Sequence, residues 1–323
     1  MGNYITRRLF QMVLVLILLS FVCYGLMSLM PGDPLDIMIS SNPKITSEDI
    51  VRLKAVYGLD QPMYMRYWAW LTDILSGDFG YSRTYKVPTT TILVPRLFNT
   101  FVLTMTALIL SLMISIPIGI ISALKKGSKF DYFTNLLAFA GISIPSFFLA
   151  IILIIIFAVW LEWFPAGGTE SVGEASLTGM AYAKDRIHYL VLPVVSLMVL
   201  QIGTFVRYTR SAMMEVLGQD YIRTARAKGI KQNKIVYLHA LKNALIPLIT
   251  VISISFSFIF SGAIITETIF AYQGVGRLVY DSIMGNDYNV AMIAFIISIA
   301  MVLIMNLVAD ILYAVVDPRI SYK

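Results

Sequence analysis

Residues 97–124 read LFNTFVLTMTALILSLMISIPIGIISAL, a stretch of 28 positions without Asp, Glu, Lys, Arg or His. About 20 apolar residues suffice for an α-helix to cross the ~30 Å hydrocarbon core of a bilayer. Five more uncharged stretches, each 18 to 30 residues long, occur at Leu9–Gly32, Tyr132–Leu161, Tyr189–Val206, Asn243–Thr266 and Tyr288–Ala309. Buried helices of soluble proteins rarely reach this length even once, and the apolar residues do not alternate as in a β-barrel. The sequence therefore predicts an all-α polytopic membrane protein with six transmembrane helices.

The composition agrees with a membrane protein. Of the 323 residues, 58% are hydrophobic and 14% charged, whereas about 25% charged residues are usual in soluble proteins. The net charge of +6 would suggest nucleic acid as a partner, but a mean hydropathy of +0.77 favours the membrane. The single cysteine, Cys23, excludes an internal disulfide and a Cys-based metal cluster, and two histidines leave no zinc site built on His pairs.

The first apolar stretch follows Arg7 and Arg8 and could be confused with a secretory signal peptide. A signal peptide has an apolar core of roughly 7 to 15 residues that ends at small residues. Here the apolar stretch continues to Met30 and stops at Pro31-Gly32-Asp33-Pro34. We therefore expect this stretch to be a permanent transmembrane helix.

Basic residues are distributed unevenly between the two sides of the six predicted spans. With a cytoplasmic N-terminus, the inner segments hold 15 Lys and Arg in 65 residues, and the outer segments hold 10 in 112. The positive-inside rule then predicts that both termini are cytoplasmic. We expect a multi-pass membrane protein.

The outer segment 33–96 is too long and too apolar for a simple connector, and it predicts a small helical insertion after the first span. One helix is expected over Thr46–Tyr57, because Thr46-Ser47-Glu48-Asp49 is a typical N-cap and Gly58 a typical C-cap. Met63–Leu75 is expected to form an amphipathic helix with aromatic residues suited to the headgroup level: Tyr64, Tyr67, Trp68 and Trp70. It is either an anchor in the interface or a docking platform for a partner outside the cytoplasm.

The inner loop 207–242 predicts a helix-turn-helix that projects from the membrane. Gly229 can adopt a positive φ and end the first helix, and Asn233 can cap the second. Small side chains at Ala225 and Ala227 would allow another protein to approach closely, and the basic residues Arg223, Arg226 and Lys228 would pair with acidic groups on it. The alternative is a solvated loop that is basic only because it lies inside.

Motifs for local chemistry are missing. The chain has no G-x-x-x-x-G-K-[ST] phosphate loop, no H-E-x-x-H and no G-x-S-x-G, and the G-x-G at Gly274 and Gly276 lacks its third glycine. The six spans contain no carboxylate or histidine, which an ion-driven carrier usually keeps. Glu267 and Asp310 stand at span edges and are expected to be boundary residues in water. Transport by this chain would need energy from a partner.

Prolines and polar residues mark the spans. Pro117, Pro145, Pro193 and Pro247 lie in or beside them, and the 30-residue third stretch predicts a tilt or a kink near Pro145. Some polar side chains on the spans are candidates for a translocation path, although hydrogen bonding between helices explains them equally well: Ser143, Ser196, Gln201, Ser253, Ser255 and Ser257.

Several short strings, taken in order, carry a family resemblance: Tyr4-Ile5-Thr6-Arg7-Arg8-Leu9, Pro31-Gly32-Asp33-Pro34, Tyr57-Gly58-Leu59-Asp60-Gln61-Pro62, Gly77-Asp78-Phe79-Gly80-Tyr81-Ser82, Arg223-Thr224-Ala225-Arg226-Ala227-Lys228-Gly229, Glu267-Thr268-Ile269-Phe270, Asp310-Ile311-Leu312-Tyr313 and Asp317-Pro318-Arg319-Ile320. Together they resemble the permease subunits of bacterial peptide ATP-binding-cassette (ABC) importers, specifically the first of the two permeases in oligopeptide and dipeptide systems. The chain departs from the family pattern at Gln273, where Pro is common, at Asn286, where Arg is common, and at Arg223, where the general coupling motif has Glu.

The resemblance implies the type I ABC importer permease fold, with residues 1–32 as N-terminus and first helix, 33–96 as insertion and 97–323 as the five-helix core. It also implies that the segment from Arg223 to Lys234 couples to an ATPase, through Arg223, Thr224, Ala225, Arg226, Ala227, Lys228, Gly229, Lys231 and Lys234. The implied partners are a second related permease, two ATPases that bind ATP and Mg²⁺, and an extracytoplasmic solute-binding protein. This chain would hold no cofactor and no metal and would not itself be an enzyme.

Short peptides are the substrate that the resemblance implies. Similar permeases serve other small solutes such as nickel complexes, so that alternative stays open. An ATP-independent channel or carrier would show activity from this chain alone. A membrane enzyme is disfavoured, because paired acids and a nucleophile constellation are missing.

Overall fold

The computed structural model describes residues 2–29, 46, 48–49, 52, 55, 60–171, 178–260 and 263–316. The regular secondary structure in these residues is helical, apart from one isolated β-bridge between Tyr81 and Pro88, and turns and irregular segments join the helices. Several sequence strings, Pro31–Pro34, Tyr57–Leu59 and Asp317–Ile320, lie outside the described residues, as does most of the helix expected over Thr46–Tyr57. Within that helix, the Thr46 hydroxyl accepts a hydrogen bond from the Asp49 N–H at 3.3 Å, as an N-cap does.

The chain divides into two compact units. The first comprises Arg96–Arg277 and the residues from Met301 onward, and the second comprises Gly2–Pro95 and Leu278–Ala300. The boundaries fall inside helices α5 (Thr89–Leu124), α13 (Val275–Met284) and α14 (Tyr288–Val316).

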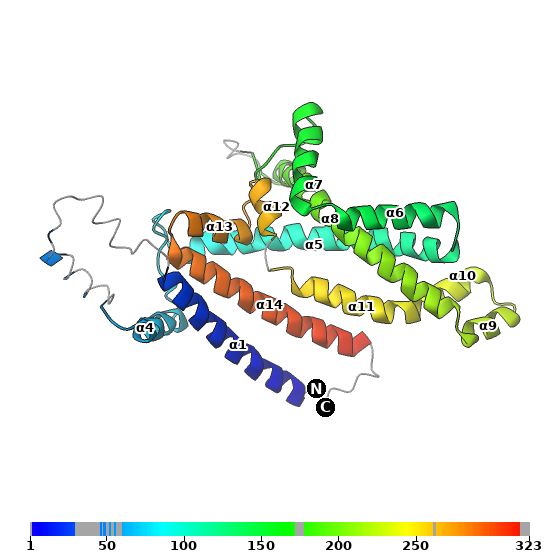
Figure 1. Ribbon diagram of the computed structural model, residues 1–323, viewed down its shortest axis with the longest axis horizontal. Helices are drawn as coiled ribbons and strands as arrows, with labels where there is room; N and C mark the ends of the chain where they lie inside the picture. Colours follow the sequence, from blue (N-terminus) through cyan, green and yellow to red (C-terminus); the bar gives the residue numbers. More distant parts are fainter. Residues whose placement is uncertain are drawn as a thin grey trace. The chain divides into compact units, whose positions relative to one another are not determined.

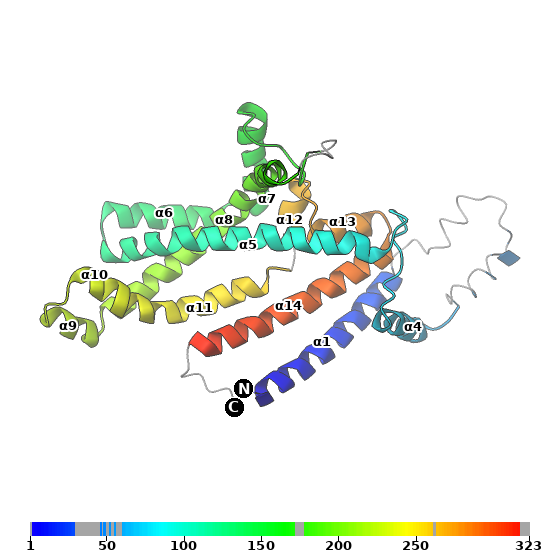
Figure 2. The ribbon, with the colours of Figure 1, turned by 180° about the vertical axis from the view of Figure 1, so that it is seen from behind.

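The larger unit contains most of the predicted spans (Figure 1). After α5 come α6 (Lys129–Ser143), α7 (Ser146–Leu153) with the π-helical η1 (Ile154–Trp160), and α8 (Met180–Leu217). Then follow α9 (Asp220–Ala227), α10 (Gln232–Lys234), the π-helical η2 (Ile235–Ala240), α11 (Leu241–Ser257) and α12 (Ile264–Ile269). Figures 1 and 2 both show α6 running along α5, with α8 crossing obliquely toward α9.

Among the residues that the structure describes, five helices are long and apolar enough to cross a membrane, and α6 with α7–η1 makes a sixth span if this bent pair is counted as one. The two halves of the pair meet at 100°. Pro145 stands at the break, and the preceding Ile144 has the extended backbone (φ −76°, ψ 124°) that proline imposes on its neighbour. The predicted kink near Pro145 is therefore confirmed, whereas Pro117, Pro193 and Pro247 lie inside continuous helices.

Two spans differ in extent from the uncharged stretches. Helix α8 has 38 residues and continues beyond Tyr189–Val206 at both ends, so it is longer than a bilayer core requires. The fifth apolar stretch does not form one helix, because α11 ends at Ser257 and α12 begins at Ile264.

Small residues bring α6 and α8 into close contact. A Cβ atom added at Gly203 would lie 2.5 Å from the Ala138 carbonyl oxygen, and one added at Gly141 would lie 3.2 Å from the Val199 carbonyl oxygen. Glycine is required at Gly203, because any side chain would push the two backbones apart.

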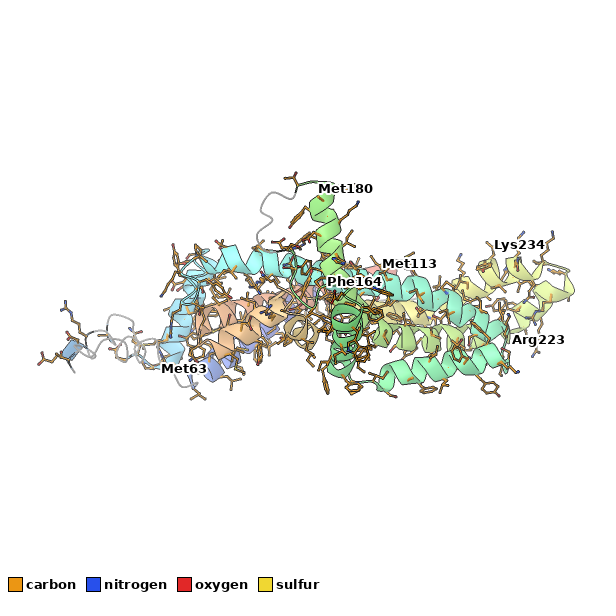
Figure 3. All side chains as sticks on the ribbon, turned by 90° about the horizontal axis from the view of Figure 1, so that it is seen from above. Met63, Met113, Phe164, Met180, Arg223 and Lys234 are labelled. Atoms are coloured by element: carbon orange, nitrogen blue, oxygen red, sulfur yellow. The ribbon has the colours of Figure 1, made fainter. Side chains whose placement is uncertain are left out.

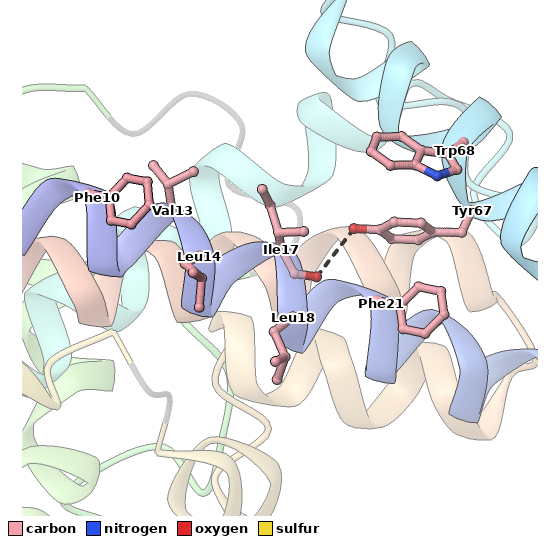
Figure 4. A pocket seen from close by; sticks show the side chains of 8 residues that line it. All are labelled: Phe10, Val13, Leu14, Ile17, Leu18, Phe21, Tyr67 and Trp68. Carbon is pink, nitrogen blue, oxygen red and sulfur yellow. Dashed lines mark hydrogen bonds between the residues drawn. The ribbon is translucent and has the colours of Figure 1, made fainter.

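In the smaller unit, α4 (Met63–Leu75) has the bounds expected for the amphipathic helix. It packs on α1 (Gly2–Ser28) through Tyr67, which is buried and whose hydroxyl lies 2.8 Å from the Ser20 hydroxyl. Figure 4 shows Tyr67 reaching the Ile17 carbonyl across an apolar groove of about 560 Å³. Tyr64 and Trp68 remain more than half exposed, as residues at a headgroup level would be.

The string Gly77–Ser82 is fixed within the same unit. The Ser82 hydroxyl donates to the Asp287 carboxylate at 2.5 Å, and the Thr84 N–H donates to the same oxygen at 3.0 Å. The Asn289 amide donates to the Phe79 carbonyl at 3.1 Å. Asn286, where the family commonly has Arg, adopts a positive φ of 55° in the turn before Asp287, a conformation that Asn tolerates better than most residues.

Candidate functional site

The segment from Asp220 to Lys234 forms the helix-turn-helix that the sequence predicts. Helix α9 ends at Ala227, and Gly229 follows with φ +73°. The Gly229 N–H donates to the Arg226 carbonyl at 2.9 Å, and the Ile230 N–H donates to the Ala225 carbonyl at 3.3 Å. These two bonds constitute a Schellman cap, so Gly229 ends the helix as expected. The second helix is only the short α10, which continues into η2.

The polar side chains of this segment face outward. All the residues expected to couple to an ATPase are exposed except Ala225: Arg223, Thr224, Arg226, Ala227, Lys228, Gly229, Lys231 and Lys234. Arg223 pairs with Asp220 at 3.2 Å, but both side chains are more than 70% exposed, so this ion pair contributes little. Figure 3 shows Arg223 and Lys234 at the same end of the helices. The turn therefore presents a basic surface.

Ala225 lies elsewhere than expected. It is 7% exposed and packs with Ile222 into a buried cluster made by the ends of four other elements. Those elements are α5, α8, η2 and α11, and their residues in the cluster are Ile120, Ala123, Ala212, Met213, Ile235, Val236, Ala240 and Ala244. The small side chain at Ala225 thus lets α9 pack closely on this cluster, which we call the seat of α9. Ala227 remains available for contact with another protein.

A buried ion pair stands beside this seat. Arg210 of α8 donates from Nε and Nη2 to the two carboxylate oxygens of Asp131, at 2.6 and 2.8 Å. The same carboxylate accepts bonds from the Ser122 hydroxyl at 2.5 Å and from the Gly127 N–H at 2.9 Å. The bidentate pair therefore joins α5, the following turn, α6 and α8. The pair is not predictable from the sequence, because its partners are 79 residues apart and no local pattern links them.

Glu267 is not a boundary residue in water, as the sequence suggested, but is fully buried. Its carboxylate accepts bonds from the Thr100 hydroxyl at 2.7 Å and from the Arg277 N–H at 2.9 Å. A Cβ atom at Gly274 would lie 2.3 Å from the Glu267 carboxyl carbon, so only glycine allows this approach. Burial raises the pKa of the Glu267 carboxyl above its ordinary value.

The Gly274–Gly276 pair is therefore a cradle for Glu267. In the sequence, the two glycines were considered only as part of a nucleotide-binding motif, which they do not complete. The structure shows that they make room for the Glu267 carboxylate. Gln273, where the family commonly has Pro, accepts a hydrogen bond on its carbonyl from the Asn99 amide at 2.8 Å.

The candidates for a translocation path do not form one group. Gln201 and Ser255 line a common pocket of about 340 Å³ with Thr104, and Gln201 also accepts a hydrogen bond from Ser111 at 2.9 Å. The remaining candidates lie outside this pocket. Ser143 and Ser257 donate to carbonyls of their own helices, Ser253 offers the carbonyl that Ser257 uses, and Ser196 is fully buried.

Two family models together match almost the entire chain. Residues 115–322 match the binding-protein-dependent transport system inner membrane component, and residues 1–104 match the N-terminal part of such membrane components. The chain belongs to this family of transport permeases. Its members are membrane components of transport systems, so the expectation that this chain is not an enzyme is supported.

Relatives in this permease family match the full length of the chain. It is 42% identical over 324 residues to the oligopeptide transport system permease protein AppB of Bacillus subtilis (strain 168), covering 100% of both proteins. It is 35% identical over 339 residues to the dipeptide transport system permease protein DppB of Escherichia coli (strain K12), again covering 100% of both.

A solved structure shows the same fold. The inward-facing MetNI methionine ABC transporter matches with a TM-score of 0.57 and 18% identity, covering 71% of this permease and 97% of that chain. The type I importer permease fold expected from the sequence is thereby confirmed.

Proposed function

We propose that the chain is the transmembrane permease subunit of an ATP-driven importer that moves short peptides into the cytoplasm. The observation that carries this proposal is the full-length similarity to permeases named for oligopeptide and dipeptide transport. The nickel-complex alternative is not favoured by these relatives. A stand-alone channel or carrier is disfavoured by membership of a family whose transport systems depend on a binding protein.

The partners in this proposal are a second related permease, two ATPases and an extracytoplasmic solute-binding protein. The ATPases bind ATP and Mg²⁺, and this chain contributes neither a cofactor nor a metal. In this proposal the basic outer surface of α9, from Arg223 to Lys228, binds in a groove of an ATPase, and acidic groups line the edge of that groove. Closure of the ATPase dimer then shifts the permease between inward-open and outward-open states.

The seating of α9 supports this role. Because Ile222 and Ala225 lie in a cluster with the ends of α5, α8 and α11, a displacement of α9 is transmitted to three helices at once. Interiors packed in this way are stiff and pass strain on. A loop that was basic only for topology would not need such a seat.

The test is reconstitution. In proteoliposomes that contain all partners, a labelled tripeptide should accumulate only when ATP is supplied, and the rate should fall to background when this permease is left out. The isolated permease should neither bind nor hydrolyse ATP. Nucleotide binding by the isolated permease, or peptide uptake without the ATPases, would contradict the proposal.

A further inference from the structure

Helix α8 carries a stripe of polar side chains. Gln201, Thr204, Tyr208 and Ser211 follow one another at steps of three and four residues, so they lie on one face of the helix. Gln201 and Thr204 are partly exposed, and Tyr208 and Ser211 are exposed. The stripe extends over eleven residues, which is ten steps or about 15 Å of helix at 1.5 Å per residue.

The neighbouring face of α8 is different. Ile202 and Val206 line an apolar groove of about 450 Å³ together with Leu137 and Gly141 of α6. One side of the α6–α8 pair is therefore suited to lipid or to an apolar partner. Gln201 and Thr204 belong to the apolar stretch Tyr189–Val206, where exposed polar groups are poorly suited to hydrocarbon, and Tyr208 and Ser211 continue the stripe into the inner segment 207–242. The polar stripe consequently faces water or a polar partner.

A pocket of about 660 Å³ lies along the stripe, with Thr204, Tyr208 and Ser211 on one side and Asn135 and Phe139 on the other. Both Arg207 and Arg210 reach it. The charge of Arg210 is compensated by Asp131, as described above. Arg207 is exposed, and its guanidinium lies 4.5 Å from the centre of the Phe139 ring. Among the described residues no carboxylate pairs with Arg207.

We infer that Arg207 receives the free carboxylate of a peptide on its way to the cytoplasm, and that the polar stripe of α8 forms one wall of that path. This inference rests on the proposed function and on the predicted orientation. The guanidinium plane offers two parallel N–H donors to a carboxylate, and its stacking on Phe139 holds that plane in place. The pocket is open to water, so binding there is weak enough to let the peptide leave.

A phospholipid headgroup would offer the same charge to Arg207. The deeper part of the stripe argues against it, because an acyl chain would then lie on Gln201 and Thr204 rather than on apolar side chains. A separate pocket at Gln201 brings the polar side chains of Thr104 from α5 and Ser255 from α11 beside this end of the stripe. A peptide, with amide groups along its length, fits such a surface better than an acyl chain does.

The first experiment compares a labelled tripeptide with its C-terminal amide in the complete reconstituted transporter, at saturating concentrations. Arg207→Gln should lower uptake of the free acid about fivefold and change uptake of the amide little, since only the acid has a charge to pair. Arg207→Lys should restore part of the rate, and Lys125→Gln, which removes another exposed charge outside the pocket, should behave like the wild type. Co-purification of the ATPase checks that each variant assembles.

The outcomes separate the two proposals. If the wild type transports both peptides but Arg207→Gln affects acid and amide equally, or affects neither, the inference about Arg207 is wrong and the proposed function stands. If the wild type transports neither peptide, the proposed function fails and the inference fails with it.

A second experiment tests the wall of the path independently of charge. In a Cys23→Ser background, Thr204→Cys and Ser211→Cys in the assembled transporter should react with a hydrophilic thiol reagent, and saturating peptide should slow the reaction. Ile202→Cys, on the apolar face of the same helix, should remain unreactive. If Thr204→Cys and Ser211→Cys are unreactive as well, the second permease covers the stripe and the inference is overturned.

Discussion

At the scale of single residues, Gly229 is the clearest test of the coupling proposed for the turn after α9. Its φ of +73° costs about 1–2 kcal/mol for a residue with a Cβ atom, while an added Cβ would meet no atom within 4 Å. Gly229→Val should therefore weaken the cap through backbone strain alone. We expect reduced ATPase co-purification and reduced peptide uptake at normal abundance in the membrane. Gly229→Asn is the matched control, because Asn tolerates the left-handed conformation, and equal loss in both variants would contradict the explanation.

Ala225 and Ala227 differ in burial and can separate folding from docking. Ala225→Glu places a charge in the seat of α9, where an unpaired buried charge costs several kcal/mol, so the permease itself should lose stability. Ala227→Glu is exposed and should leave the thermal midpoint unchanged while it weakens association with the ATPase. Thermal unfolding and co-purification of both variants check this. A stable Ala225→Glu permease would show that the seat is not closely packed in solution.

Glu267 predicts a pH dependence of stability. Burial raises the pKa of this carboxyl above its ordinary value of 4.5, so the folded protein binds a proton that the unfolded chain has already lost. This contribution to stability is complete below about pH 4.5 and is lost as the pH rises through the raised pKa. As the pH rises through this range, the thermal midpoint of Glu267→Gln should fall less than that of the wild type. Parallel curves for the two proteins would refute the assignment.

Residues that act locally were predictable from the sequence, and residues that act over distance were not. Gly229 was recognised as a helix end because its signal lies within one turn. Asp131 and Arg210 are 79 positions apart, and Thr100 and Glu267 are 167 positions apart. The residues next to each partner give no indication of the other. Ala225 was expected to contact another protein, but it packs inside its own chain, because a sequence does not tell an internal contact from an external one.

At the scale of elements, the Asp131–Arg210 pair should hold α5, α6 and α8 together. Asp131→Asn removes the carboxylate and leaves Arg210 uncompensated, which should lower the free energy of unfolding by about 3 kcal/mol. Glu170→Gln is the matched control, since Glu170 pairs with Arg186 at 3.4 Å and is 48% exposed, so its loss should cost at most about 1 kcal/mol. Thermal unfolding in detergent measures both. Similar losses of stability in the two variants would mean that the buried ion pair stabilises the fold no more than the exposed one.

The helices themselves follow closely from composition. The charge-free stretches predict the spans, because a transmembrane helix must be long and apolar whatever its tertiary contacts are. Pro145 was recognised as a break because its effect is local. The extension of α8 beyond its apolar stretch was not predicted, since charged residues beyond the hydrocarbon region neither favour nor forbid a helix.

At the scale of the whole molecule, the orientation in the membrane is the remaining prediction. Lys184 and Gln232 are exposed and lie on opposite sides in the predicted topology. In a Cys23→Ser background, Lys184→Cys should react with an impermeant thiol reagent added to intact spheroplasts, and Gln232→Cys should react only after the membrane is opened. Ser171 is a poorer site, because its hydroxyl is bound to Asp185 at 2.6 Å. Labelling of both cysteines from outside would overturn the orientation.

The close contact of α8 with α6 at Gly203 has a mechanical consequence. Gly203 stands about 14 residues from one end of α8 and about 23 from the other, or roughly 21 and 35 Å at 1.5 Å per residue. With this crossing as a fulcrum, a tilt applied at the α9 end is amplified about 1.6-fold at the opposite end. A displacement of ~3 Å at the α9 end would thus become ~5 Å at the opposite end of α8. Lengthening α8 at either end would change this ratio of displacements without altering the contact at Gly203.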